Sequence, residues 1–190
     1  MLWQCSIHCP GLSASTSIST DDINGVKSVY GTKSAGKPRI TGASVVGTNL
    51  TLTGSAAING ALSSQANDIG FVLTGNAAAN TLLGGLGHDV LVGGGGADNM
   101  AGGAGNDTYF VNTSGNAVTE LAGQGIDTVF SSVTFGLFAN LENLTLTGSA
   151  AIDGALSSQA NDVGFTLTGN AAANILFGGL GHDVLVSGGG

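Results

Sequence analysis

The chain has 190 residues, 34 of them glycine, and a formal net charge of −8 at pH 7. Its four Lys and Arg residues all precede residue 40; of its twelve acidic residues only Asp21 and Asp22 do, which leaves ten acids and no base in residues 40–190. Such a segment repels nucleic acid and anionic membranes, so both are excluded as electrostatic partners. No apolar run is long enough for a membrane-spanning helix, and residues 1–12 lack the features of a signal peptide.

An amphipathic helix is predicted over residues 21–30. Acidic residues occupy its first turn, and Gly31 follows its last residue. Its apolar side chains fall on one side at helical spacing: Ile23, Val26, Val29 and Tyr30.

This segment resembles the last helix of matrixin- and serralysin-type zinc metalloproteases. The likeness is carried by Leu12, Asp21, Asp22, Ile23, Gly25, Tyr30 and Gly31. It implies that residues 1–31 are the C-terminal remnant of a protease domain whose zinc and catalytic unit lie upstream. The histidines cannot form the H-E-x-x-H motif of such enzymes, because no two of them are four apart: His8, His88 and His182. No catalytic residue is therefore expected.

Cys5 and Cys9 flank His8, and the three residues together supply only three of the four ligands of a structural zinc site. A disulfide or free thiols are favoured over a metal here. Residues 32–49 are interpreted as a linker.

Residues 50–110 are predicted to form a first repeat block. Four nonapeptides run in register from Gly75, Gly84, Gly93 and Gly102 and approximate the pattern G-G-x-G-x-D-x-U-x. The sixth position is Asn80, Asp89, Asp98 or Asp107. Glycine permits a tight six-residue turn, and a three-residue strand follows it. The predicted fold is mainly β and parallel, with an inward apolar column: Leu73, Leu82, Leu91, Met100 and Tyr109.

The repeat resembles the calcium-binding nonapeptide of RTX, or hemolysin-type, proteins. The resemblance implies a parallel β-roll, two nonapeptides per turn, with calcium between loops n and n+2. One implied site joins Asp89 and Asp107, together with carbonyls of Gly84, Leu86, Gly103 and Gly105. A weaker site, with Asn in place of one Asp, joins Asn80 and Asp98, together with Gly75, Ala77, Gly94 and Gly96. Such proteins are typically secreted without an N-terminal signal peptide.

Residues 111–143 are predicted to be a connector of short β-strands. Its acidic residues are interpreted as solvated strand-edge charges: Glu120, Asp127 and Glu142. Asp68 and Asp162 are interpreted in the same way, and His88 and His182 are expected to be exposed without a role.

Residues 144–190 repeat residues 50–96 at an offset of 94, with six differences. We expect inward Leu167, Leu176 and Leu185 in this second, truncated block. Asp183 has no following loop with which to share an ion.

The sequence therefore predicts a secreted RTX module that binds calcium ions and folds when it binds them, with zinc expected only in the missing catalytic region. Two alternatives stay open: a zinc metalloendopeptidase acting through an upstream region, and a structural or adhesive repeat protein. No membrane span is predicted, and protein partners are unknown.

Overall fold

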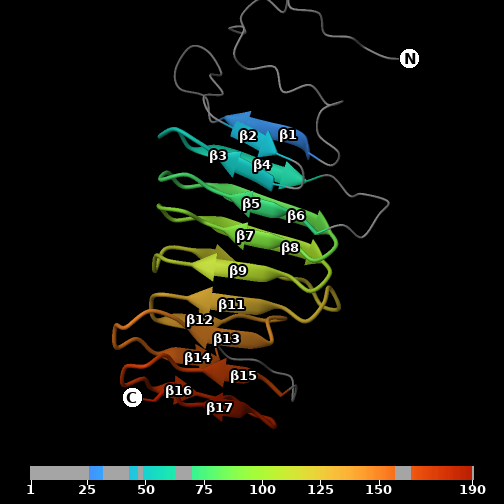
Figure 1. The fold of residues 1–190 in the computed structure, drawn as a ribbon. Coiled ribbons are helices and arrows are strands. Elements are labelled where there is room, and N and C mark those ends of the chain that lie inside the picture. The colour runs from blue at the N-terminus through green and yellow to red at the C-terminus, as the bar shows by residue number, and fades with distance from the viewer. Residues whose placement is uncertain (1–25, 32–42, 47–48, 63–69, 157–163, 190) are drawn as a thin grey trace, which may run out of the picture.

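A computed structural model describes residues 26–31, 43–46, 49–62, 70–156 and 164–189. Within these ranges every regular element is a β-strand. The strands stack as successive rungs, from β1 and β2 at one end to β16 and β17 at the other (Figure 1). No helix in the described part of the chain is long and apolar enough to cross a membrane.

One face of the stack is a nine-stranded sheet, ordered β17-β15-β13-β11-β9-β7-β5-β3-β2. Neighbouring strands are parallel except for the pair β2 and β3, which is antiparallel. Its strands are β2 (Ala43–Val46), β3 (Asn49–Leu52), β5 (Val72–Thr74), β7 (Val90–Val92), β9 (Thr108–Val111), β11 (Thr128–Ser131), β13 (Asn143–Leu146), β15 (Thr166–Thr168) and β17 (Val184–Val186).

The remaining strands form a five-stranded sheet, β1-β4-β6-β8-β10, and a three-stranded sheet, β12-β14-β16. Their bounds are β1 (Val26–Gly31), β4 (Ile58–Leu62), β6 (Thr81–Leu86), β8 (Asn99–Ala104), β10 (Ala117–Val118), β12 (Phe135–Leu137), β14 (Gly154–Leu156) and β16 (Leu176–Phe177). From β5 to β10 the chain alternates between the nine-stranded and the five-stranded sheet, so two nonapeptides complete one turn. The predicted parallel β-roll is confirmed.

The register follows the nonapeptide phase. Leu73 is paired with Leu91, and Leu91 with Tyr109, across β5, β7 and β9. Leu82 is paired with Met100 across β6 and β8. All five side chains are at most 1% exposed, so the predicted inward column is confirmed. All three sheets contribute to one hydrophobic core. Along the strands of the nine-stranded sheet from β3 to β15, side chains therefore alternate between the core and more accessible positions.

The helix predicted over residues 21–30 is wrong where the structure describes it. Val26–Gly31 is strand β1, which pairs antiparallel with β4. The edge of β4 offers backbone donors and acceptors that an extended segment can satisfy, and this pairing outweighs a marginal helix propensity. Residues 1–25 and 32–42 lie outside the described residues, as do the predictions made for them.

The second repeat block keeps the strands but loses burial toward β17. Leu167 is fully buried and Leu176 partly buried against the core. Leu185 is 48% exposed, so the prediction that it points into a core is wrong. Leu91, its counterpart 94 residues earlier, lies on a strand between β5 and β9, whereas β17 has a neighbour on one side only among the described strands. Burial here depends on the next turn and not on the local sequence.

Candidate metal centre

The glycine-rich loops stack in pairs, two nonapeptides apart. In the pair formed by loops 84–89 and 102–107, Gly85 lies beside Gly103 in the strand register. Gly103 and Gly105 have φ values of 100° and 130°, which favour glycine. A side chain at Gly105 would overlap the carbonyl of Gly87, and one at Gly84 would overlap the carbonyl of Gly102. The glycines therefore allow the backbones of successive turns to approach closely.

Loops 75–80 and 93–98 form the second stacked pair. Gly94 and Gly96 have φ values of 87° and 90°. A Cβ on Gly94 would meet the carbonyl oxygens of Gly75 and Asn76, and one on Gly95 would lie 3.2 Å from the Cα of Ala77. The structure thus brings together the loops that the sequence paired. Whether their carbonyls ligate an ion stays a prediction.

A first acidic column runs through the turns that lead into β7, β9 and β11. The backbone N–H of Phe71 donates to Oδ1 of Asp89 (2.8 Å), and that of Asp89 donates to Oδ1 of Asp107 (2.7 Å). The N–H of Asp107 then donates to Oδ1 of Asp127 (2.7 Å), and that of Asp127 to Oε2 of Glu142 (2.7 Å). Each carboxylate is thereby fixed to the preceding turn through one oxygen.

A second column, on the other set of turns, contains Asn80, Asp98 and Asn116. The N–H of Asn80 donates to Oδ1 of Asp98 (2.8 Å), and that of Asp98 to Oδ1 of Asn116 (3.1 Å). The side chain of Asn80 is itself engaged: its Oδ1 accepts from the N–H of Asn76 (2.8 Å), and its Nδ2 donates to the carbonyl of Ile58 (2.7 Å). Asn80 therefore closes its loop by hydrogen bonding.

Five buried carboxylates have one oxygen without a hydrogen-bond partner among the described residues. These atoms are Oδ2 of Asp89, Asp98, Asp107 and Asp127, and Oε2 of Glu120. All five side chains are at most 5% exposed. A buried anionic oxygen without a donor is costly, and buried charges in proteins are normally paired or bound to a metal. The donor set consists only of oxygen, which suits a hard cation such as calcium.

Burial raises the pKa of each of these carboxyls. The pKa of Asp107 and that of Glu120 reach about 7, and those of Asp89 and Asp127 about 6. Burial is the largest cause, and for Asp107 the nearby charges of Asp89, Asp127 and Glu120 raise the pKa further. The pKa of Asp98 is also raised by burial. Without a cation, burial in the folded chain therefore disfavours the ionised form of these carboxyls.

Glu120 and Asp127 are not the solvated strand-edge charges that the sequence predicted. Glu120 is 5% exposed and Asp127 is fully buried. A signal for Asp127 was present, because Gly123, Gly125, Asp127 and Val129 keep the glycine, acid and apolar spacing of a nonapeptide. The interpretation missed it because Ala122 replaces the first glycine and the repeat is out of phase with those before it. Nothing local marks Glu120.

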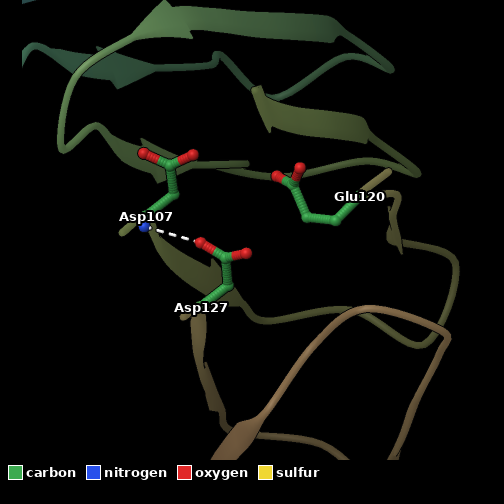
Figure 2. Close-up of side chains that lie close together, drawn as sticks. All are labelled: Asp107, Glu120 and Asp127. Carbon is green, nitrogen blue, oxygen red and sulfur yellow. Dashed lines mark hydrogen bonds between the residues drawn. The ribbon is translucent and has the colours of Figure 1, made fainter. Parts of the chain in front are cut away.

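Asp107, Glu120 and Asp127 form the one group of three or more potential ligand residues found among the described residues. One ligand oxygen from each lies within 4.8 Å of the others. Figure 2 shows the three side chains reaching this region from different stretches of backbone, with the bond from the N–H of Asp107 to Asp127 dashed. Glu142 is only partly buried, with one oxygen bonded to Asp127, and stays outside the group.

The other predicted residues have simpler surroundings. Asp183 repeats the bond of Asp89, because its Oδ1 accepts from the N–H of Phe165 (3.2 Å), but it is only partly buried. His88 and His182 are exposed as expected. His88 nevertheless makes a contact that was not predicted, since its Nδ1 accepts from the N–H of Asn106 (2.7 Å).

Turns of two nonapeptides, stacked glycine loops and buried carboxylates with unpaired oxygens are the features of a β-solenoid suited to binding cations. Comparison with known families agrees: the RTX calcium-binding nonapeptide repeat matches in four copies, over residues 74–109 and 166–190. The chain therefore carries RTX calcium-binding repeats on a β-solenoid.

The chain is also similar to the endo-1,3-1,4-β-glycanase ExsH of Rhizobium meliloti (strain 1021). The two are 37% identical over 79 residues, which are 42% of this chain and 14% of the relative. The chain thus covers a small part of that protein's length. No solved structure matches.

Proposed function

We propose that this chain is a structural calcium-binding module of an exported protein, and that calcium outside the cell drives its folding. The observation that carries the proposal is the set of five buried carboxylates, each with an oxygen that lacks a donor among the residues that the structure describes. Cations bound in the two columns would compensate these oxygens, whereas the chain offers no Lys or Arg beyond residue 39 that could do so.

The energetic argument follows from the charge distribution. In the cation-free fold, Asp89, Asp107 and Asp127 lie on successive turns, and their charges raise the pKa of Asp107. Glycine-rich loops also lose much conformational entropy on ordering. Because the complete set of ligands exists only in the folded roll, binding free energy becomes folding free energy.

The proposed ligands are the residues that the stacked loops bring together. Asp89 and Asp107 would bind calcium with loop carbonyls at Gly84, Leu86, Gly103 and Gly105. Asp98 would bind calcium more weakly, with carbonyls at Gly75, Ala77, Gly94 and Gly96. Asn80 brings no charge to this site, and its side chain is already engaged in hydrogen bonds within the fold. Asp183 is the corresponding ligand of the second block.

The parent protein is a separate part of the proposal. A repeat module of this kind would be joined to a functional unit outside residues 1–190, and a zinc metalloendopeptidase is the alternative that residues 1–31 suggest. The strand at Val26–Gly31 weakens that alternative, because the resemblance was to a terminal helix. The similarity to the glycanase ExsH supports a parent enzyme of another class no less than residues 1–31 support a protease.

Circular dichroism during a calcium titration tests calcium-driven folding. We expect a partial strand signal in chelator, from a marginally stable fold, and a cooperative rise with a midpoint of roughly 0.1–1 mM calcium, the range of extracellular modules. Magnesium at equal ionic strength is the control for charge screening, and should give a smaller rise. Strand signal that is already complete in chelator would overturn the proposal.

A further inference from the structure

We propose that Asp107, Glu120 and Asp127 form a further cation site, which shares Asp107 with the proposed Asp89–Asp107 site, is closed by Glu120 and ties the connector to the first repeat block. Two of its three ligand residues lie beyond residues 74–109, where the nonapeptide repeat matches. The site requires only the folded roll, so it stands whether or not calcium drives folding.

Each of the three carboxylates has one oxygen fixed and one oxygen without a partner. Oδ1 of Asp107 accepts from the N–H of Asp89, and Oδ1 of Asp127 accepts from the N–H of Asp107. Within the described ranges, Oδ2 of both residues is buried and has no hydrogen-bond partner, and the same holds for Oε2 of Glu120. The three carboxylates also each offer an oxygen within 4.8 Å of the others. Three buried carboxylates so close together, each with an oxygen that has no hydrogen-bond partner among the described residues, need a common counter-charge.

The side chain of Glu120 is held in place by hydrogen bonds to one of its two carboxylate oxygens. Its Oε1 accepts from the N–H of Gly102 (2.9 Å) and of Gly103 (3.3 Å), and from the hydroxyl of Tyr109. These donors fix the carboxylate beside the loop that contains Asp107, although Glu120 comes after β10. All three donors go to the same oxygen, so Oε2 is left for a ligand. This is preorganisation that a solvated surface charge would not have.

The chemistry of the site selects the class of cation. The three carboxylates carry up to three negative charges. The cluster contains no nitrogen or sulfur ligand, which disfavours zinc and copper. Magnesium requires near-ideal octahedral geometry and dehydrates reluctantly, whereas calcium accepts irregular oxygen ligands. We therefore assign the site to calcium, with trivalent lanthanides as probes of the same chemistry. With one carboxylate more than the Asp89–Asp107 pair, it should bind more tightly than the loop sites.

Calorimetric titration of the full chain with calcium tests the site, using Glu120→Gln as the main variant. Glutamine keeps Oε1 as an acceptor for Gly102, Gly103 and Tyr109 and replaces only the unpartnered oxygen. We expect E120Q to lose one tight equivalent, with affinity at that site reduced at least about tenfold. Asp153→Asn is the matched control, because it removes one acidic charge outside the cluster and keeps Oδ1, which accepts from the N–H of Ile175.

Terbium luminescence gives a second readout. The hydroxyl of Tyr109 donates to Glu120, so the phenol ring lies near the site and can sensitise a lanthanide bound there. E120Q should lose this tyrosine-sensitised emission, and Asp98→Asn, in the second column, should retain it. Tyr109→Phe should lose the emission but keep the calcium equivalent. Asp127→Asn keeps the acceptor for the N–H of Asp107 and should match E120Q, so a folding defect peculiar to E120Q is recognised.

Equal calcium stoichiometry and affinity in E120Q, D127N and D153N would overturn the site. That result would leave calcium-driven folding standing if the strand signal of all variants still required calcium. A different result would support the site and overturn calcium-driven folding: the strand signal is complete in chelator, and one tightly bound calcium equivalent is lost only in E120Q and D127N.

Discussion

At the scale of single residues, the two oxygens of each buried carboxylate differ in their contacts. One accepts a hydrogen bond from a backbone N–H of the preceding turn, and the other has no partner within the described part of the chain. Changing Asp to Asn keeps the first contact and removes the charge. Such variants therefore separate the structural contribution of the side chain from its contribution to cation binding.

Asp107→Asn should change stability in opposite directions with and without calcium. In chelator at about pH 8, the variant should melt at a higher temperature, because it removes a buried charge whose neighbours repel it. With saturating calcium it should melt at a lower temperature and bind calcium at least about tenfold more weakly. Thermal melts monitored by circular dichroism measure both effects. Destabilisation of similar size under both conditions would contradict a role as a ligand.

Asn80→Ala is the matched comparison at the second column. It removes hydrogen bonds to the N–H of Asn76 and the carbonyl of Ile58, so it should cost about 1–3 kcal/mol of stability with or without calcium. Its effect on calcium affinity should be smaller than that of Asp107→Ala, as the sequence already suggested. Equal losses of affinity in the two alanine variants would contradict this ranking.

The raised pKa values predict how stability depends on pH. In the folded cation-free chain the pKa values of Asp107 and Glu120 are about 7, above their ordinary values of 3.8 and 4.5. The folded state therefore holds protons that the unfolded state releases. This contribution to stability is fully present below about pH 4 and is lost as the pH rises through about 7.

In chelator, the melting temperature should consequently fall as the pH rises from about 4 to about 8. Saturating calcium should remove or reverse the trend, because calcium binds the ionised carboxylates and competes with protons. Melts at a series of pH values, with and without calcium, provide the measurement. A melting temperature in chelator that increases across this range would show that burial does not disfavour the charged groups.

At the scale of elements, the nonapeptide phase was sufficient to predict β5 to β9 and their inward residues. The repeat sets both the turn and the strand, and nothing in the neighbouring turns opposes it. The connector was harder, because Asp107 and Asp127 are 20 residues apart where the repeats give 18. Glu120 could not be predicted, since only the folded backbone places it beside Gly102 and Tyr109.

The two repeat blocks provide an internal control for core packing. Leu91→Ala should cost about 2–5 kcal/mol, because Leu91 is fully buried between neighbouring turns. Leu185→Ala changes the same residue in a nearly identical sequence, yet it should cost much less, because Leu185 is 48% exposed. Chemical denaturation in saturating calcium compares the two variants. Equal costs would mean that the last turn is covered in solution.

At the scale of the whole molecule, parallel turns contact mainly the turns next to them, as in other solenoids, whose stability is a sum of repeat and interface terms. Hydrogen bonds between neighbouring strands are directed from one rung to the next, along the stack seen in Figure 1. A tension applied along that direction therefore loads the rungs in series, and the weakest one opens first. The sparsely covered rung β17 should peel away at low force, whereas rungs bridged by cations should hold until the ion leaves. The module would then yield in discrete extensions, each releasing about one turn of chain, and its mechanical strength would follow the calcium concentration around it.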